Sequence, residues 1–181
     1  ALGGAIFWNT NIRNTYVNNA HETRERVAYE RQFGPFVTWP QPRVSALDVT
    51  LDLYPARRAF RVAGEMTLVN PSREPISSFY IEGDVKRLKL DVPEAASVRI
   101  PYPKCCPVFE VTLKAPLAPG ATLKLAFAEE QDADGLLNGD SFNVHYNGTR
   151  LDGMEIVPLI GVHHRRFLTD EARRESAGLP R

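Results

Sequence analysis

The sequence has few cysteines, no excess of charge of either sign and no long apolar run. Its two cysteines, Cys105 and Cys106, are adjacent. Neighbouring cysteines can pair only through a strained eight-membered ring, so they fit a disulfide framework poorly. We interpret them as two thiols at the start of a strand, with redox or metal binding as the alternatives. At 181 residues, the chain is long enough to bury a core without covalent staples.

The balanced charge and the absence of long apolar segments exclude two kinds of partner. Basic and acidic residues number 22 each, and no basic run is present that could neutralise a phosphate backbone, so nucleic acid is not an expected partner. No segment approaches the roughly 18 consecutive apolar residues of a membrane helix. The opening "ALGGAIFW" also lacks the basic start and the length of a secretory signal. We therefore expect this chain to be soluble by itself.

The first part of the chain is predicted to be helical. Residues 14–33 are rich in helix formers, and Glu22 with Arg26 is a favourable pair one turn apart, before Gly34 ends the helix. This helix has few apolar positions, so it must lie on another element or reach toward one. We predict that residues 1–40 form a helical lead-in and a proline-containing linker.

From Val44 onward, apolar and polar residues alternate, which is typical of strands with one buried face. Turn sequences separate many short runs, and this spacing predicts a mainly β fold, an antiparallel β-sandwich or saddle with a short N-terminal helix and a C-terminal helical tail. We assign residues 41–168 to this β domain. Residues 169–181, with Thr169 and Asp170 as candidate N-caps, begin a connection to a further domain. The runs predicted as strands are 43–54, 59–70, 76–83, 85–92, 97–102, 108–115, 121–130, 141–149 and 154–162.

Two segments carry residue types that metals prefer. "HETRE", residues 21–25, lacks the final histidine of the H-E-x-x-H zinc helix, and no third ligand is evident nearby. "DADGLLNGD", residues 132–140, offers oxygen ligands suited to calcium, but it does not follow the EF-hand pattern and is interpreted as a solvated hairpin tip. We therefore predict no metal site and no catalytic residue in this chain.

Two further motifs have simple structural interpretations. Asn147 in "YNGT" is formally a glycosylation sequon, but the same residues are a tight-turn signal, and we favour the turn. His163 and His164 follow a predicted strand, where neighbouring side chains point to opposite faces, so they are not expected to share a metal. Glycine-rich phosphate loops and a G-x-S-x-G elbow are absent.

Three stretches together resemble a known family: "IFWNTNIRNTY", "PQPRVSALDVTLDLYPARRAFRVAGEMTLVN" and "NGTRLDGMEIVPLIG". They are similar to the entry into the peptidase portion of bacterial membrane proteins that fuse an ABC transporter permease to a gluzincin aminopeptidase of the aminopeptidase N type. The resemblance covers nearly the whole chain and rests on β pattern and position more than on reactive residues.

This resemblance implies a non-catalytic N-terminal β-saddle domain that helps to shape a peptide-binding cleft. In the family the zinc-binding helix belongs to the following domain, so zinc is expected there and no cofactor in this chain. The implied partners are that missing catalytic domain, peptides and the membrane-spanning part of the parent protein. The implied location is the extracytoplasmic face of a bacterial membrane, within a larger protein that is itself a candidate zinc-dependent aminopeptidase.

The resemblance also implies one substrate-binding residue. Family members carry a T-Q-x-E-P or S-Q-x-x-P segment whose glutamine helps to hold the free α-amine of the substrate. In "MEIVPL", Pro158 matches the proline and Glu155 falls at the glutamine, while Val157 stands where many relatives have an acidic residue. A carboxylate can accept charge-assisted hydrogen bonds from an ammonium group. The alternative is that Glu155 is an ordinary solvent-facing strand residue.

A second function remains open. The chain is alternatively an extracytoplasmic protein-interaction module of an ABC transporter permease without peptidase activity, docking a partner through exposed strand edges or through the His163 to Arg166 border. A stand-alone enzyme is the least favoured class.

Overall fold

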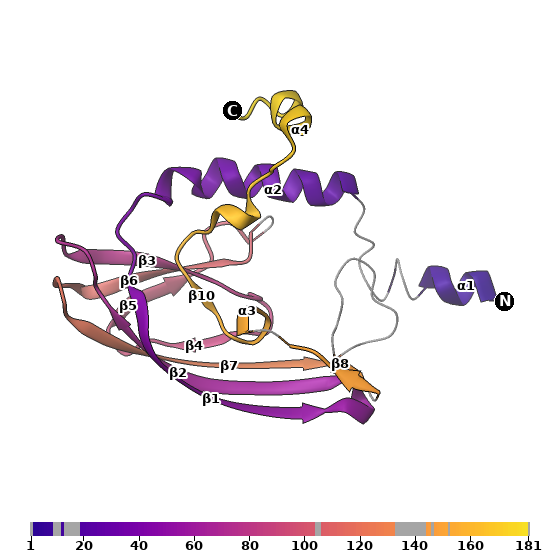
Figure 1. Cartoon of the computed structure of the whole chain (residues 1–181), viewed down its shortest axis with the longest axis horizontal. Coiled ribbons are helices and arrows are strands. Elements are labelled where there is room, and N and C mark those ends of the chain that lie inside the picture. Colours follow the sequence, from indigo (N-terminus) through magenta and orange to yellow (C-terminus); the bar gives the residue numbers. More distant parts are fainter. Residues whose placement is uncertain are drawn as a thin grey trace.

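The computed structural model describes residues 2–8, 12, 19–103, 106–132, 144–145, 147–151 and 153–180. Two four-stranded antiparallel sheets face each other, and a long helix lies across the outside of one of them (Figure 1). The predicted mainly β architecture with helices at both ends is therefore confirmed. Among the described residues, no helix combines the length and apolar character needed to cross a bilayer.

The first sheet has the strand order β1-β2-β7-β4. Its members are β1 (Arg43–Tyr54), β2 (Ala59–Val69), β7 (Thr122–Asp132) and β4 (Lys89–Asp91). A 3-10 turn, η3 (Pro55–Arg57), joins β1 to β2, and Arg58 closes it in the left-handed conformation. The two strands then pair antiparallel along almost their whole length, from Tyr54 with Ala59 to Arg43 with Val69.

The second sheet has the strand order β10-β3-β6-β5. Its members are β10 (Leu159–Ile160), β3 (Ile76–Glu82), β6 (Val108–Leu117) and β5 (Ala95–Arg99). A separate small hairpin joins β8 (Val144–His145) to β9 (Gly148–Thr149). Asn147 is an exposed residue of the turn between them, so the turn predicted from "YNGT" is confirmed.

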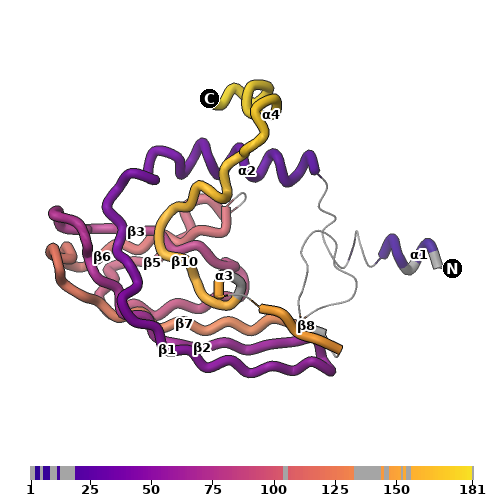
Figure 2. Tube along the Cα trace, viewed as in Figure 1, coloured from indigo at the N-terminus to yellow at the C-terminus, as the bar shows by residue number. Residues whose placement is uncertain are grey.

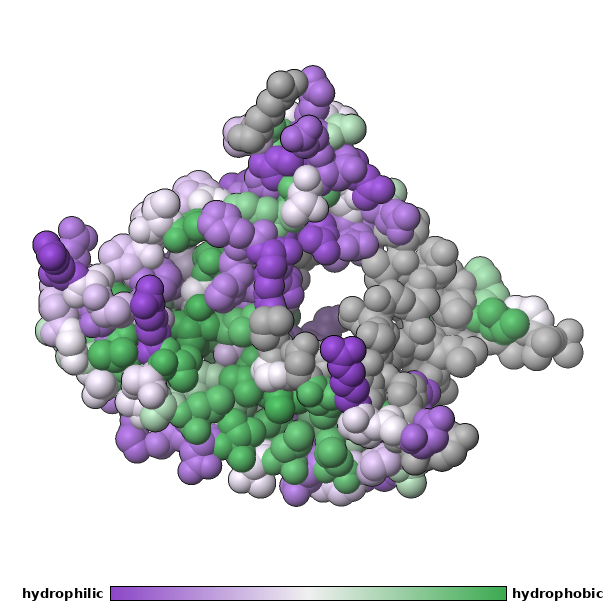
Figure 3. All heavy atoms as spheres, in the orientation of Figure 1, coloured by the Kyte–Doolittle hydropathy of each residue, from purple (hydrophilic) through white to green (hydrophobic). Residues whose placement is uncertain are grey.

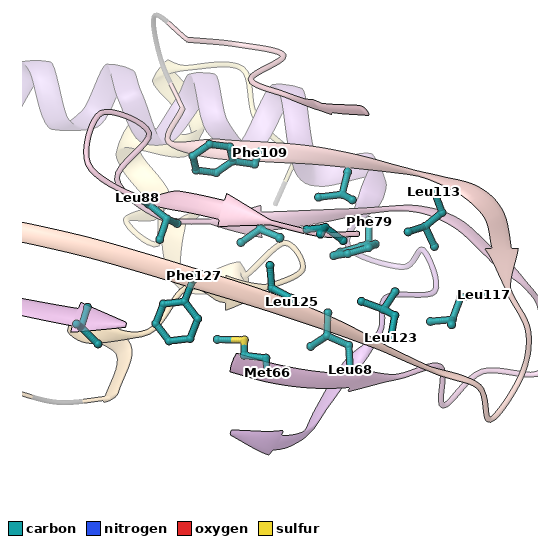
Figure 4. Close-up of a cluster of buried hydrophobic side chains, with 14 of the residues drawn as sticks. Met66, Leu68, Phe79, Leu88, Phe109, Leu113, Leu117, Leu123, Leu125 and Phe127 are labelled. Carbon is teal, nitrogen blue, oxygen red and sulfur yellow. The ribbon is translucent and has the colours of Figure 1, made fainter. Parts of the chain in front are cut away.

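The main core fills the space between the two sheets (Figure 4). Strand alternation places every second side chain of each sheet in this space. Residues with no more than 3% exposure include Met66, Leu68, Phe79, Leu125 and Phe127. Burial of such large apolar side chains stabilises each by roughly 1.5–3 kcal/mol relative to exposure. The core therefore fixes the two sheets face to face.

A second, smaller core lies on the outer face of the β10-β3-β6-β5 sheet. Helix α2 (Asn19–Phe33) places Tyr29 and Phe33 against Tyr80 of β3 and Val108 of β6. Tyr80 alternates with core residues along β3, so β3 is covered on both faces. The predicted helix with few apolar positions therefore lies on the sheet through one narrow stripe.

The end of the chain packs on the other side of α2. Figures 1 and 2 show the segment after β10 passing α2 and ending in α4 (Glu171–Ser176), beyond the helix from the sheets. Asp170 caps α4, as predicted, because its side chain accepts a hydrogen bond from the Arg173 amide at 2.8 Å. The remaining short helices are α1 (Leu2–Phe7), η2 (Gly34–Phe36), α3 (Gly153–Ile156) and η4 (His164–Arg166).

Three predicted strands differ clearly from the sequence pattern: the run 97–102 is shifted to Ala95–Arg99, and two others are much shorter than predicted. Only Lys89–Asp91 of the run 85–92 forms a strand, because Asp84 begins a hydrogen-bonded turn in which its carbonyl accepts from the Arg87 and Leu88 amides. Of the run 154–162, only Leu159–Ile160 is a strand. The prediction that Glu155 lies on a strand was therefore wrong, because its backbone belongs to the short helix α3.

One acidic residue points toward the core side of the first sheet. Glu129 follows Leu123, Leu125 and Phe127 on the inner face of β7 and is paired with Val62 of β2. Partial burial, and then the nearby carboxylate of Asp84, raise its pKa from the ordinary 4.5 to about 6, while Arg87 acts in the opposite direction.

This raised pKa predicts a specific pH dependence. Because the folded state holds the proton more tightly than the unfolded state, the contribution of Glu129 to stability is present below pH 4.5 and is lost as the pH rises through about 6. Glu129→Gln should remove this loss and raise the free energy of unfolding at pH 7 by about 1 kcal/mol, allowing for solvent screening. Urea unfolding between pH 4 and 8 measures it.

A matched control is Glu130→Gln on the solvent-facing side of the same strand. The hydrogen bond from Arg61 lowers the pKa of Glu130, so its pH dependence has the opposite sign. Identical pH profiles for wild type and Glu129→Gln would contradict the assignment.

Candidate functional site

A pocket of about 580 Å³ lies where the linker after α2 meets the segment after β10. Residues 37–43 form one wall and residues 160–163 another, and Pro71 and Ser72 complete the lining. The two main walls are more than a hundred residues apart in sequence. β10 brings them together because it pairs with β3, while the linker runs from α2 into β1.

Gln41 lines this pocket and carries a hydrogen-bond donor that is unpaired among the described residues. Pro40 and Pro42 flank it, which keeps the linker extended. Its Oε1 accepts a hydrogen bond from the Tyr80 backbone amide at 3.0 Å, and this contact fixes which end of the side-chain amide faces β3. Its Nε2 is buried and has no hydrogen-bond partner in the described part of the chain. An unpaired buried amide donor is costly, so a ligand acceptor there would be stabilising.

Gly161 allows the opposite wall to approach. Its amide donates a hydrogen bond to the Tyr80 carbonyl at 2.8 Å. The backbone carbonyl of Tyr80 is therefore bound by Gly161, and its backbone amide by Gln41. Its φ of +98° lies in a region that other residues adopt only with strain. The two walls therefore meet on the same residue of β3.

His163 contributes the second unpartnered nitrogen. Its Nε2 is buried and has no hydrogen-bond partner among the described residues, and its side chain lines the pocket. Its backbone amide donates to Glu82 Oε1 at 3.2 Å and to the Tyr29 hydroxyl at 3.3 Å. These backbone bonds fix the residue and leave its imidazole available to a ligand as donor or acceptor, according to its tautomer.

A buried carboxylate lies behind His163. Glu82 is 2% exposed and accepts a hydrogen bond from the Tyr29 hydroxyl. Arg166 supplies the compensating charge, with its Nε 2.9 Å from Glu82 Oε2 and its guanidinium over the Tyr29 ring at 5.6 Å. Burial first, and then the charge of Glu82, raise the pKa of Tyr29 well above its usual range, so Tyr29 stays a hydrogen-bond donor.

A second ion pair fixes the segment that follows. Two guanidinium nitrogens of Arg174 in α4 donate hydrogen bonds to the Glu30 carboxylate of α2, at 2.6 and 2.8 Å. The Glu30 carboxylate also accepts a hydrogen bond from the Leu168 amide at 3.2 Å. Glu30 is 8% exposed, so this two-point arginine contact is largely removed from water. Together the two carboxylates hold residues 163–174 against α2.

The walls of the pocket combine polar and apolar surfaces. Trp39 packs edge-on against Phe36 at 4.7 Å and remains half exposed, while prolines, Ile160 and Val162 supply the other surfaces. Exposed Arg43 stands at the rim. Proline and aromatic surfaces with a few fixed hydrogen-bonding groups suit an extended peptide, whose carbonyl oxygens can accept from Gln41 and His163.

The metal-type motifs are not brought together. The described residues contain no group of three or more His, Cys, Asp or Glu side chains placed to hold a metal. In α2, His21 Nε2 lies 3.5 Å from Glu25 Oε1, a contact within one helix turn. His164 is exposed and packs against Phe167 at 5.0 Å, apart from His163 in the pocket. The histidine pair thus diverges, as the sequence indicated.

Other predicted residues lie partly or wholly outside the described part. The side chain of Glu155 and residues 133–140 of the acidic loop are among them. Cys106 is 3% exposed and disulfide-bonded, so the interpretation of the cysteines as two thiols is wrong; Cys105 lies outside the described residues.

Comparison of the chain with protein-family models, curated proteins and solved structures finds no match. The site must therefore be interpreted from its own geometry. Sequence reasoning did not select Gln41 or the pocket role of His163. The signal for Gln41 was the "PQP" sequence, a polar residue held between two prolines at the entry to the first strand.

Tyr29→Phe tests the buried cluster behind the pocket. The change removes the hydroxyl that donates to Glu82 and leaves the ring in place, so the free energy of unfolding should fall by about 2 kcal/mol, the usual value for a hydrogen bond to a buried charge. Tyr80→Phe, in the same core, is the control and should change stability by less than about 0.5 kcal/mol. Equal effects of the two changes in urea unfolding would show that the Tyr29 bond contributes nothing specific.

Proposed function

We propose that this chain is a non-catalytic, peptide-binding β-sandwich domain of a larger membrane-associated protein of the aminopeptidase N type. In this proposal the pocket between the linker and the segment after β10 holds an extended peptide. The zinc and the hydrolytic chemistry belong to a catalytic domain of the same polypeptide, and the whole lies on the extracytoplasmic face of a bacterial membrane.

The observation that carries the proposal is the pair of buried, unpartnered nitrogens in one pocket, Gln41 Nε2 and His163 Nε2. Buried polar groups in folded proteins are nearly always hydrogen-bonded, so two orphaned groups on residues that line one pocket support a ligand that pairs them when the walls adjust to it. A peptide backbone offers carbonyl acceptors at regular intervals. The pocket walls contribute the apolar contact that an uncharged backbone needs.

The sequence resemblance supports the same region. The segment "MEIVPL", which resembles the amine-holding segment of the family, leads directly into β10 and the pocket wall at residues 160–163. Pro158 is buried at the start of this wall. In the proposal, Glu155 of α3 receives the free α-amine of a peptide whose following residues enter the pocket.

Gln41→Glu tests the pocket. The variant keeps an oxygen to accept from the Tyr80 amide but replaces the buried donor with an acceptor, so a peptide carbonyl loses its partner. Because an unpaired buried carboxylate is destabilising, the amide NMR spectrum of the variant is checked for the native fold before binding is measured. Binding of tetra-alanine, followed by the amide and indole NMR signals of residues 37–43 and 160–163, should weaken about tenfold or more.

The same chemical change at Gln131 of β7, outside the pocket lining, is the control and should leave the affinity unaltered. Peptide-induced shifts confined to other residues, or none at millimolar tetra-alanine, would refute the pocket as the peptide site.

Glu155→Ala tests the amine anchor. Wild type should prefer tetra-alanine to its acetylated form by about tenfold, because a carboxylate–ammonium hydrogen bond exceeds a neutral one. The variant should bind both forms alike. Glu171→Ala, at an exposed position of α4, is the control.

An unchanged preference in Glu155→Ala would remove that residue from the proposal. Stoichiometric zinc together with turnover of aminoacyl reporter substrates by this chain would overturn the non-catalytic assignment as a whole.

A further inference from the structure

Strand β1 differs from the other outer strands of the two sheets. β4, β10 and β5 have 3, 2 and 5 residues, whereas β1 has 12. Proteins commonly keep edge strands short because a long edge exposes a row of backbone donors and acceptors to another chain. Within the described residues, only β2 pairs with β1, so its other side is open over its whole length (Figure 1).

One face of β1 is apolar, and the core covers only its middle part, at Val49 and Leu51. Leu47 and Leu53 are paired with the buried Met66 and Phe60, so they face the core side of the sheet. Yet they are 47% and 42% exposed, and Val44 on the same face is 44% exposed. Figure 3 shows hydrophobic surface on the part of the molecule where Figure 1 places β1 and β2. The inner face of the sheet therefore extends beyond the area that the second sheet covers.

The other face of β1 carries two acidic residues. Asp48 and Asp52 project from it; Asp48 is directly opposite Glu65 of β2, and Asp52 is opposite Arg61. Neither aspartate has an ion pair within the described part of the chain. The neighbouring basic side chains are already paired with other acids: Arg57 with Asp132, Arg61 with Glu130, and Lys124 with Glu65.

We propose that the open edge of β1 binds an extended partner segment in which apolar and basic residues alternate, adding it as a fifth strand to the sheet. Its backbone pairs with the free groups of β1, and its apolar residues continue the inner row at Val49 and Leu51. Its basic residues lie beside Asp48 and Asp52, where opposite charges across strands are favourable. The partner is thus a polypeptide with strand-forming, cationic character.

The charge pattern favours such a partner over a second copy of the chain. A two-fold pairing centred on Thr50 places Asp48 directly opposite Asp52, which is repulsive. A pairing centred on Val49 places Asp48 opposite Thr50 and Asp52 opposite Ala46, so it supplies no cation to either aspartate. A segment with lysine or arginine four residues apart satisfies both positions.

The experiment uses a capped peptide of sequence VKVTVKV and the full chain. Binding at low salt should protect the amides of β1 from hydrogen exchange. The charge-swapped peptide VEVTVEV should bind about tenfold more weakly. VKPTVKV, which lacks the backbone donor at the residue opposite Leu51, should also lose affinity by about tenfold. The double variant Asp48→Lys with Asp52→Lys should reverse the preference and bind VEVTVEV more tightly, and because both positions are exposed, the fold is expected to persist.

Several results would overturn the proposal. They are failure of VKVTVKV to bind at millimolar concentration, equal binding of VKPTVKV, an unreversed charge preference in the folded double variant, or protection outside β1. Concentration-dependent dimerisation that occupies the β1 edge, seen in sedimentation, would also overturn it in favour of a second copy. Peptide binding at the pocket is detected from the NMR signals of residues 37–43 and 160–163. The pocket proposal and the β1-edge proposal are therefore tested independently.

Discussion

The buried carboxylate of Glu82 is the constraint around which this end of the molecule is organised. A carboxylate with 2% exposure must be neutralised and hydrogen-bonded, because an unpaired charge in the interior is strongly destabilising. α2 supplies the Tyr29 hydroxyl, and the segment after β10 supplies the His163 amide and the Arg166 guanidinium. α2 and the segment after β10 must therefore both pack on β3 in positions that bring these groups to Glu82. This packing places His163 in the pocket wall.

The polar contacts of α2 explain how a helix with so narrow an apolar stripe can remain on the sheet. Tyr29 and Phe33 bury their rings, but most of the other contacts are charged, including the two-point contact of Glu30 with Arg174. Such buried pairs contribute less net stability than their geometry suggests, since desolvation offsets the attraction. Breaking one partner is nonetheless costly, so the pairs favour a single arrangement of helix, sheet and tail.

The sequence predicted the sandwich well and the site poorly, for physical reasons. β1 and β2 were found almost to the residue because alternation and the "YPARR" turn are local signals. Only a fragment of 154–162 became a strand because β10 can pair only where β3 has an open edge, which is a tertiary property. Gln41 and His163 could not be paired from sequence, because their proximity depends on both segments docking onto Tyr80 and Glu82.

The pocket walls come from residues about 120 positions apart, and most of these residues lie outside the two sheets; Arg43 of β1 and Ile160 of β10 are the exceptions. The site therefore needs more than the pairing of the strands, because the linker and the segment after β10 must both dock on Tyr80 of β3. A ligand that binds only this docked arrangement also stabilises it by mass action. Occupancy of the pocket and docking of these two segments are therefore thermodynamically linked.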